Sequence, residues 1–187
     1  MQHLLIGIDI DRLKRNEGFK RSVYYDNEDN LTVCYGYNIT GNNGFPDAFY
    51  VLYPPGLVIK CIATGNFTEI QGDWLLTYKL KEVVKEACDI FGDAKFIKYH
   101  QNVRNVIVDM LYNMGKKRFL TFKNMQAALF LDDYLQAAYE IRDSFYYSKC
   151  LEIETNLKIK GIKNTFNRAE ENAILLENIN FKDKCHL

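Results

Sequence analysis

The hydrophobic pattern changes its period early in the chain, and this change is the strongest constraint on the fold. Asp9 or Asp11 can cap a helix that runs to about Arg21, because a carboxylate satisfies free backbone N–H groups and suits the helix dipole. Two strands follow at residues 22–25 and 31–37, where β-branched and aromatic residues flank a polar, Asn-rich turn. The sequence therefore predicts a helix followed directly by a β-hairpin.

Most of the remaining chain shows the three- and four-residue spacing of apolar side chains that is typical of helices. The longest predicted helix runs from about Asp73 to Phe91. It would join a small N-terminal lobe of about residues 12–72 to a helical C-terminal lobe of about residues 92–187. We also expect a short helix after Pro46, irregular chain over 56–72, helices over 101–114 (ending at Gly115), 122–131, 133–147 and 167–179, and a small hairpin within 149–165.

Composition supports a single, mainly helical α+β domain. The chain has 187 residues, of which 48% are hydrophobic, so it can bury a core of its own. Only 3 prolines and 11 glycines are present, which favours helices over a turn-rich β-sandwich or barrel. The 24 basic and 24 acidic side chains cancel, and this balance argues against a protein that binds nucleic acid or anionic lipid.

The sequence offers no signal for export, membrane insertion or metal binding. The apolar segment at residues 4–8 is cut short by Asp9 and follows no Lys or Arg, so we expect no signal peptide. No apolar run approaches the roughly 20 residues of a spanning helix, so we expect no stable membrane insertion. Five scattered cysteines favour reduced thiols in a protein made in the cytosol. The three histidines lack a metal-ligand spacing.

Two acidic residues and a threonine are the candidate catalytic groups. Glu17 stands late in the first predicted helix, Asp26 at the hairpin bend and Thr32 on the returning strand, so the three meet at one cleft edge. Glycoside hydrolysis needs one protonated and one ionised carboxyl group in different environments. The spacing alone is also compatible with a Glu17 that is an ordinary solvent-exposed helix residue and an Asp26 that only stabilises the turn.

Motifs around these residues and towards the C-terminus form a recognisable pattern. The chain contains E-G-F at 17–19, Y-Y-D at 24–26, L-T-V-C-Y-G-Y at 31–37, M-L-Y-N-M-G at 110–115 with Phe122, and N-R-A at 167–169. These motifs resemble those of the T-even phage lysozymes, glycoside hydrolase family 24, over about residues 12–179. The resemblance implies a lysozyme-like fold with a saccharide cleft between the two lobes, and no cofactor or metal.

The resemblance also implies roles for individual residues. Glu17 would be the general acid that faces the glycosidic oxygen, Asp26 the carboxylate below the sugar ring, and Thr32 a residue that helps to hold the attacking water. Hydrolysis in this family is understood as inverting, which implies carboxyl groups roughly 6.5–9.5 Å apart. Arg168 would pair with the acid and tether the C-terminal lobe to the first helix. Tyr112 would line the cleft opposite the hairpin.

Asn38, just after the hairpin, would also contact substrate. Both Asn38 and Tyr112 are equally compatible with ordinary packing roles within their lobes. The chain departs from the family pattern at four further positions. Cys34 stands where the family usually has Gly, and Tyr37 where it usually has His. Met125 and Glu140 replace a small hydroxyl and an amide that contact saccharide, so we expect no such contacts from them. The segment before the N-R-A motif is about fifteen residues longer than in the T-even enzymes.

The function that follows from the resemblance is hydrolysis of the bond between N-acetylmuramic acid and N-acetylglucosamine in peptidoglycan. We expect a monomeric phage endolysin that accumulates in the host cytoplasm and reaches the wall when a holin opens the membrane. Two alternatives are a catalytically silent carbohydrate-binding relative and a muramidase of a phage tail or an antibacterial toxin. A Cys88–His100 nucleophile has no recognisable local signature.

The neutral total hides an uneven charge pattern. Residues 12–21, 95–123 and 149–168 carry net charges of +4, +6 and +3, whereas residues 22–59 contain four acids and no Lys or Arg. The sequence therefore predicts an acidic catalytic region and basic segments that can face an anionic wall.

Overall fold

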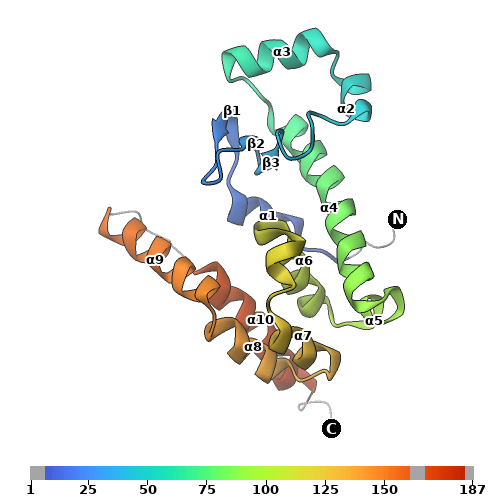
Figure 1. The fold of residues 1–187 in the computed structure, drawn as a ribbon, viewed down its shortest axis with the longest axis vertical. Coiled ribbons are helices and arrows are strands. Elements are labelled where there is room, and N and C mark those ends of the chain that lie inside the picture. The colour runs from blue at the N-terminus through green and yellow to red at the C-terminus, as the bar shows by residue number, and fades with distance from the viewer. Residues whose placement is uncertain (1–6, 161–166, 184–187) are drawn as a thin grey trace. The chain divides into compact units, whose positions relative to one another are not determined.

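Helices dominate the computed structural model, which describes residues 7–160 and 167–183, with side chains as far as Ile179 (Figure 1). A small antiparallel sheet lies near the N-terminus. The described residues divide into two units, one formed by residues 9–82 and the other by residues 83–183 with the segment 7–8. The mainly helical α+β class predicted from the sequence is confirmed.

The first helix, α1 (Ile10–Glu17), begins as predicted and ends early. Asp9 caps it, because its carboxylate accepts a hydrogen bond of 2.9 Å from the backbone N–H of Arg12. Gly18 has a φ of 68° and ends the helix, so the prediction of a helix to about Arg21 is wrong. A glycine with a positive φ turns the chain at this point and leads it into the first strand.

The predicted hairpin is confirmed, with one additional strand. Strands β1 (Lys20–Tyr25), β2 (Leu31–Cys34) and β3 (Tyr37–Asn38) form an antiparallel sheet in the order β1-β2-β3. The returning strand, predicted as continuous, is broken because Cys34 and Gly36 take positive φ values of 56° and 77°. The chain turns back there and adds β3 to the far edge of β2.

Three helices complete the first unit and lead out of it: α2 (Asp47–Leu52), α3 (Pro55–Thr64) and α4 (Glu69–Phe91). The prediction of irregular chain over 56–72 is wrong. A proline fits the first turn of a helix, so Pro55 begins α3 directly after the end of α2. The long predicted helix is present as α4 and begins four residues before Asp73.

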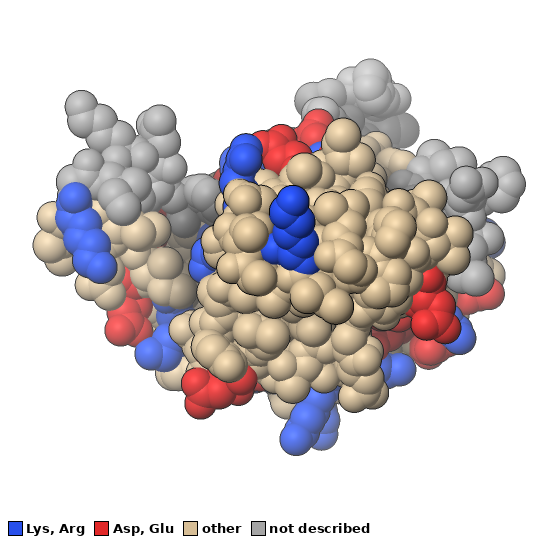
Figure 2. Space-filling view, turned by 90° about the horizontal axis from the view of Figure 1, so that it is seen from above, with Lys and Arg blue, Asp and Glu red and all other residues tan. Residues whose placement is uncertain are grey.

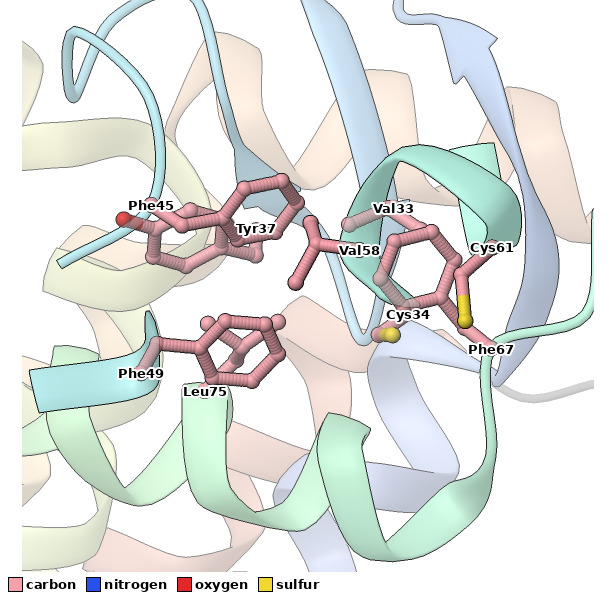
Figure 3. Packing of buried hydrophobic residues seen from close by; sticks show 9 residues of the cluster. All are labelled: Val33, Cys34, Tyr37, Phe45, Phe49, Val58, Cys61, Phe67 and Leu75. Carbon is pink, nitrogen blue, oxygen red and sulfur yellow. The ribbon is translucent and has the colours of Figure 1, made fainter. Parts of the chain in front are cut away.

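Aromatic side chains fill the core of the first unit (Figure 3). The ring of Phe45 lies 5.8 Å from that of Tyr37, 5.1 Å from that of Phe49 and 5.9 Å from that of Phe67, centroid to centroid. Such offset contacts add to the free energy gained from burial. The buried cluster consists of Val33, Cys34, Tyr37, Phe45, Phe49, Val58, Cys61, Phe67 and Leu75.

Helix α4 approaches the sheet at a glycine. A β-carbon built on Gly72 would lie 2.8 Å from the Phe19 ring and 3.2 Å from both the Cys34 β-carbon and the Tyr35 ring. Lys14 of α1 forms an ion pair of 2.7 Å with Asp73, the next residue of α4. These contacts join α1, the sheet and α4 into one packed unit.

All regular secondary structure among the described residues of the second unit is helical. Helix α10 packs against α8, α6 and α9, and α7 packs against α8. Gly115 has non-helical backbone angles and interrupts α6 at the predicted helix end. The helices are α5 (Asp93–Lys98), α6 (Gln101–Phe119), α7 (Lys123–Phe130), α8 (Tyr134–Arg142), α9 (Phe145–Ile159) and α10 (Arg168–Asp183), of which α5 has no counterpart in the predicted elements.

Two predictions for the second unit are wrong. The helix expected over 133–147 is two helices, because Ser144 caps a new helix by accepting a hydrogen bond from the N–H of Tyr147. The hairpin expected within 149–165 is replaced over its first part by α9, and its remaining residues lie outside the described ones. In the parts of the chain that the structure describes, no helix is long and apolar enough to span a membrane.

Candidate active site

The turn between β1 and β2 fixes the carboxylate of Asp26. Its Oδ1 accepts hydrogen bonds from the backbone N–H groups of Glu28 (2.8 Å) and Asn30 (2.9 Å). The side-chain amide of Asn30 donates to both carboxylate oxygens, at 3.3 Å and 3.2 Å. An aspartate that binds its own turn in this way has a fixed orientation.

The same contacts determine the charge of Asp26. Partial burial raises its pKa, but the hydrogen bonds from Asn30, Glu28 and Thr32 outweigh that effect, and the net pKa lies below its usual value. The carboxylate is therefore ionised at neutral pH. It has the charge that the second carboxyl group of a glycoside hydrolase requires.

Thr32 lies beside Asp26 on the neighbouring strand. Its side chain is buried, and its hydroxyl oxygen is 3.4 Å from Oδ2 of Asp26 and 3.1 Å from the carbonyl oxygen of Asn30. A hydroxyl can donate one hydrogen bond and accept others. Thr32 and Asp26 thus form a fixed pair of polar groups, as the spacing of the two residues predicts.

Glu17 is the last residue of α1, directly before the glycine that ends this helix. It is half-buried, and a β-carbon built on Gly36 would lie 3.0 Å from its Oε2. The carboxyl group is therefore packed against the turn between β2 and β3. Its surroundings differ from those of Asp26, which receives hydrogen bonds from its own turn.

Tyr24 is a further polar residue near the candidate catalytic groups. Burial raises the pKa of its phenol, and the negative charges of Glu17 and Asp26 raise it further. Tyr24 therefore lies within electrostatic range of both carboxyl groups. The Y-Y-D motif contains this residue, but the sequence reasoning assigned it no role. The signal that could have identified it is its place opposite Thr32 in the hairpin.

The geometry agrees with the comparison to known families. The sequence model of the phage lysozyme family matches residues 14–164, which is most of the chain. This protein belongs to the phage lysozyme family. No curated protein matches the chain. Membership makes it a peptidoglycan-degrading lysozyme, and so a glycoside hydrolase.

Asn38 of this lysozyme holds the loop that follows the sheet. Its Oδ1 accepts a hydrogen bond of 2.5 Å from the N–H of Gly41, and its carbonyl oxygen accepts one of 2.5 Å from the side chain of Asn42. In the sheet it pairs with Thr32. The residue therefore lies on the strand next to the candidate site, and its contact with substrate stays a prediction.

Arg168 lies in the second unit, at the start of α10. Its side chain is buried, so it is not simply an exposed arginine at the start of a helix. Its guanidinium donates to both carboxylate oxygens of Asp109, with Nε–Oδ2 at 2.9 Å and Nη2–Oδ1 at 3.0 Å. The side chain of Asn172 donates to the same carboxylate at 2.9 Å. This network joins α10 to α6. The pairing of Arg168 with Glu17 stays a prediction, as does the substrate contact of the half-buried Tyr112 on α6.

The positions that depart from the family pattern are accommodated in the fold. Burial raises the pKa of the Cys34 thiol to about 12, so this cysteine has no nucleophilic character. The Tyr37 hydroxyl donates a hydrogen bond of 3.1 Å to the carbonyl oxygen of Gly44, where the family's histidine would pair with a carboxylate. Met125 is buried in α7, and the absence of a saccharide contact from it stays a prediction. Among the described residues, no cluster of His, Cys, Asp and Glu side chains could hold a metal ion.

Proposed function

We propose that this lysozyme is a muramidase that hydrolyses the bond between N-acetylmuramic acid and N-acetylglucosamine. One observation carries the proposal: Asp26 and Thr32 form a polar pair at the turn between β1 and β2, and the carboxyl group of Glu17 packs against the turn between β2 and β3. Asp26 receives several hydrogen bonds and is ionised, whereas Glu17 is packed against Gly36 at the end of a helix. This difference suits one group to act as a base and the other as an acid.

In the proposed reaction, Glu17 donates its proton to the glycosidic oxygen as the bond from that oxygen to the anomeric carbon breaks. A water molecule attacks the anomeric carbon from the opposite face of the sugar and gives its proton to Asp26. The hydroxyl of Thr32 helps to orient this water, because it lies beside the same carboxylate. The product carries the inverted configuration at the anomeric carbon.

We further propose that the protein is a monomeric phage endolysin. It would accumulate in the host cytoplasm and reach peptidoglycan when a holin permeabilises the membrane. The family assignment supports a role in phage lysis. The proposal involves neither nucleic acid nor stable insertion into a membrane.

Release of reducing sugar from purified peptidoglycan tests the catalytic assignment. The wild type should release reducing sugar. The rate for Glu17→Gln should be lower by ~100-fold or more, because an amide cannot act as the acid that protonates the leaving oxygen. Glu82→Gln is a matched control, since Glu82 is an exposed carboxylate paired with Lys79 on α4. Wild-type protein without turnover would identify a silent binding relative, and an active Glu17→Gln would refute the role of Glu17.

The stereochemistry needs a separate measurement. Proton NMR of the first product released from soluble peptidoglycan chains should detect the α-anomer before mutarotation. The β-anomer as first product would refute inversion, while leaving the identity of the acid intact.

A further inference from the structure

Tyr24 faces the same side of the sheet as the candidate catalytic residues. It lies directly opposite Thr32 in the antiparallel pair of β1 and β2, and residues opposite each other in such a pair point to the same face. Asp26 follows two residues later, and its Oδ2 lies 3.4 Å from the Thr32 hydroxyl. The pairing of the strands is irregular between Lys20 and Tyr24, and such bulges re-aim side chains.

A lysine holds the Tyr24 ring. The Nζ of Lys20 lies 3.6 Å from the centroid of this ring, which is the geometry of a cation–π contact. Both residues belong to β1, so the contact spans the irregular part of the strand. This contact favours one position of the half-buried ring on the edge strand of the sheet.

The hydroxyl of Tyr24 is suited to donate a hydrogen bond. It makes no hydrogen bond with any residue that the structure describes. Burial and the charges of Glu17 and Asp26 raise the pKa of the phenol, so the hydroxyl keeps its proton at neutral and acidic pH. An ionised Asp26 can only accept hydrogen bonds, whereas Tyr24, opposite Thr32 in the sheet, supplies a donor.

We propose that Tyr24 is a further substrate-binding residue, whose hydroxyl donates a hydrogen bond to an oxygen of the saccharide bound beside Glu17 and Asp26. Lys20 acts as a positioning residue that keeps the ring in place. This inference rests on the proposed function, because it requires a polysaccharide substrate. Sugar hydroxyl, ring and amide oxygens are all acceptors for a neutral phenol.

Steady-state kinetics on soluble, uncross-linked peptidoglycan chains test the inference. Tyr24→Phe keeps the ring and removes only the hydroxyl, so KM should rise roughly five-fold with little change in kcat, as expected for one neutral hydrogen bond made equally in ground and transition states. Tyr25→Phe is the matched control, because the Tyr25 side chain next along the strand is 72% exposed. It should leave both constants unchanged.

Lys20→Met tests the positioning role. The measurement is the KM of this variant, alone and combined with Tyr24→Phe, which a purely structural role of Lys20 would not couple. Lys20→Met should raise KM by less than Tyr24→Phe does, and the double variant should be no weaker than Tyr24→Phe alone, because the two residues act through one hydroxyl. Arg21→Met is its control, since Arg21 is an exposed cation on the same strand. Additive losses of affinity in the double variant would refute the positioning role.

Calorimetric binding separates this inference from the proposed function. The same chains are titrated into Glu17→Gln and into the double variant Glu17→Gln/Tyr24→Phe, so that no turnover is needed. The double variant should bind roughly five-fold more weakly. If the wild type hydrolyses peptidoglycan and the two affinities are equal, Tyr24 does not bind substrate. If the wild type fails to hydrolyse it, the proposed function is wrong, and a five-fold difference in binding would still support Tyr24.

Discussion

At the scale of single residues, the candidate site depends on backbone angles as much as on side chains. Gly18 ends α1 directly after Glu17, and Gly36 presents a surface without a side chain to the same carboxyl group. Gly36 has a φ of 77°, which other residues adopt only at a cost in free energy. Cys34 accepts this cost with a φ of 56°, at a position where related lysozymes usually have Gly. The position of Glu17 therefore follows from two glycines.

The hydrogen bonds to Asp26 make a prediction about pH. The pKa of Asp26 is lower in the folded protein than in the unfolded chain, where it is about 3.9. Ionised Asp26 therefore stabilises the fold at pH values above 3.9, and this stabilisation is lost as the pH falls through the pKa of the folded state. Asp26→Asn should therefore lower the free energy of unfolding at pH 6 and have a smaller effect near pH 2.5. Thermal unfolding of both proteins across this range measures the difference. A difference that is independent of pH would show that ionised Asp26 contributes nothing.

The sequence predicted the candidate site only in part. Spacing and motif identified Glu17, Asp26 and Thr32, because these residues follow one another over a short stretch with a recognisable hairpin. Tyr24 was missed because a tyrosine opposite Thr32 in a hairpin has no chemical role that the pattern alone assigns, and its contact with Lys20 spans an irregular part of β1. The buried partner of Arg168, Asp109, is 59 residues away in the chain, and such a long-range pair leaves no local signal.

At the scale of elements, the close approach of α4 to the sheet makes the second prediction. Gly72→Ala would bring a β-carbon to within 2.8 Å of the Phe19 ring and 3.2 Å of the Cys34 β-carbon, so the packed core must shift. We expect a loss of about 1–3 kcal/mol in the free energy of unfolding, as for other overpacked sites. Chemical denaturation monitored by circular dichroism measures it.

Gly56 provides the control for this prediction. It lies in α3, and no atom is within 4 Å of a β-carbon built on it. Gly56→Ala should therefore stabilise the protein by up to about 1 kcal/mol, because alanine has the higher helix propensity. Equal effects of the two substitutions would mean that the contacts at Gly72 cost nothing.

Periodicity predicted long helices better than short ones. Helix α3 was missed because residues 48–59, which include its first half, carry no charged side chain, so no polar face of a helix stands out. The same stretch contains the adjacent Pro54 and Pro55, which are the N-cap and the first residue of α3. The hairpin was predicted within 149–165 because the alternation of Leu157, Ile159 and Ile162 in the sequence resembles that of a strand. The cap at Ser144 determines the structure there.

At the scale of the whole molecule, ion pairs reduce the charge pattern predicted from the sequence. Several cations of the basic segments contact acids, and a paired cation contributes less to the long-range field. The view from above, onto α2 and α3, shows a mostly uncharged face with a few isolated basic and acidic side chains (Figure 2). The pairs include Lys14–Asp73, Lys95–Asp132, Lys116–Asp89, Lys158–Glu154 and Arg168–Asp109.

The remaining basic charge makes the third prediction, which concerns salt. Raising the ionic strength from 0.01 M to 0.15 M shortens the Debye length from about 30 Å to about 8 Å, which screens attraction to an anionic wall. The initial rate on purified peptidoglycan should therefore fall, by roughly two- to three-fold, less than for a strongly cationic lysozyme. Lys117 and Lys123, both exposed, lie in the most basic segment, 95–123. Lys117→Gln/Lys123→Gln should reduce this salt dependence.

A second pair of lysines separates long-range attraction from a general effect of lost charge. Lys81 and Lys85 are exposed on α4, where basic and acidic residues alternate, so Lys81→Gln/Lys85→Gln removes the same charge from a balanced segment. If the basic segment steers the enzyme, this variant should keep more of the wild-type salt dependence than Lys117→Gln/Lys123→Gln does. Equal slopes for both variants would assign the effect to net charge alone. A rate that does not fall with salt in the wild type would mean that none of the basic segments attracts the wall.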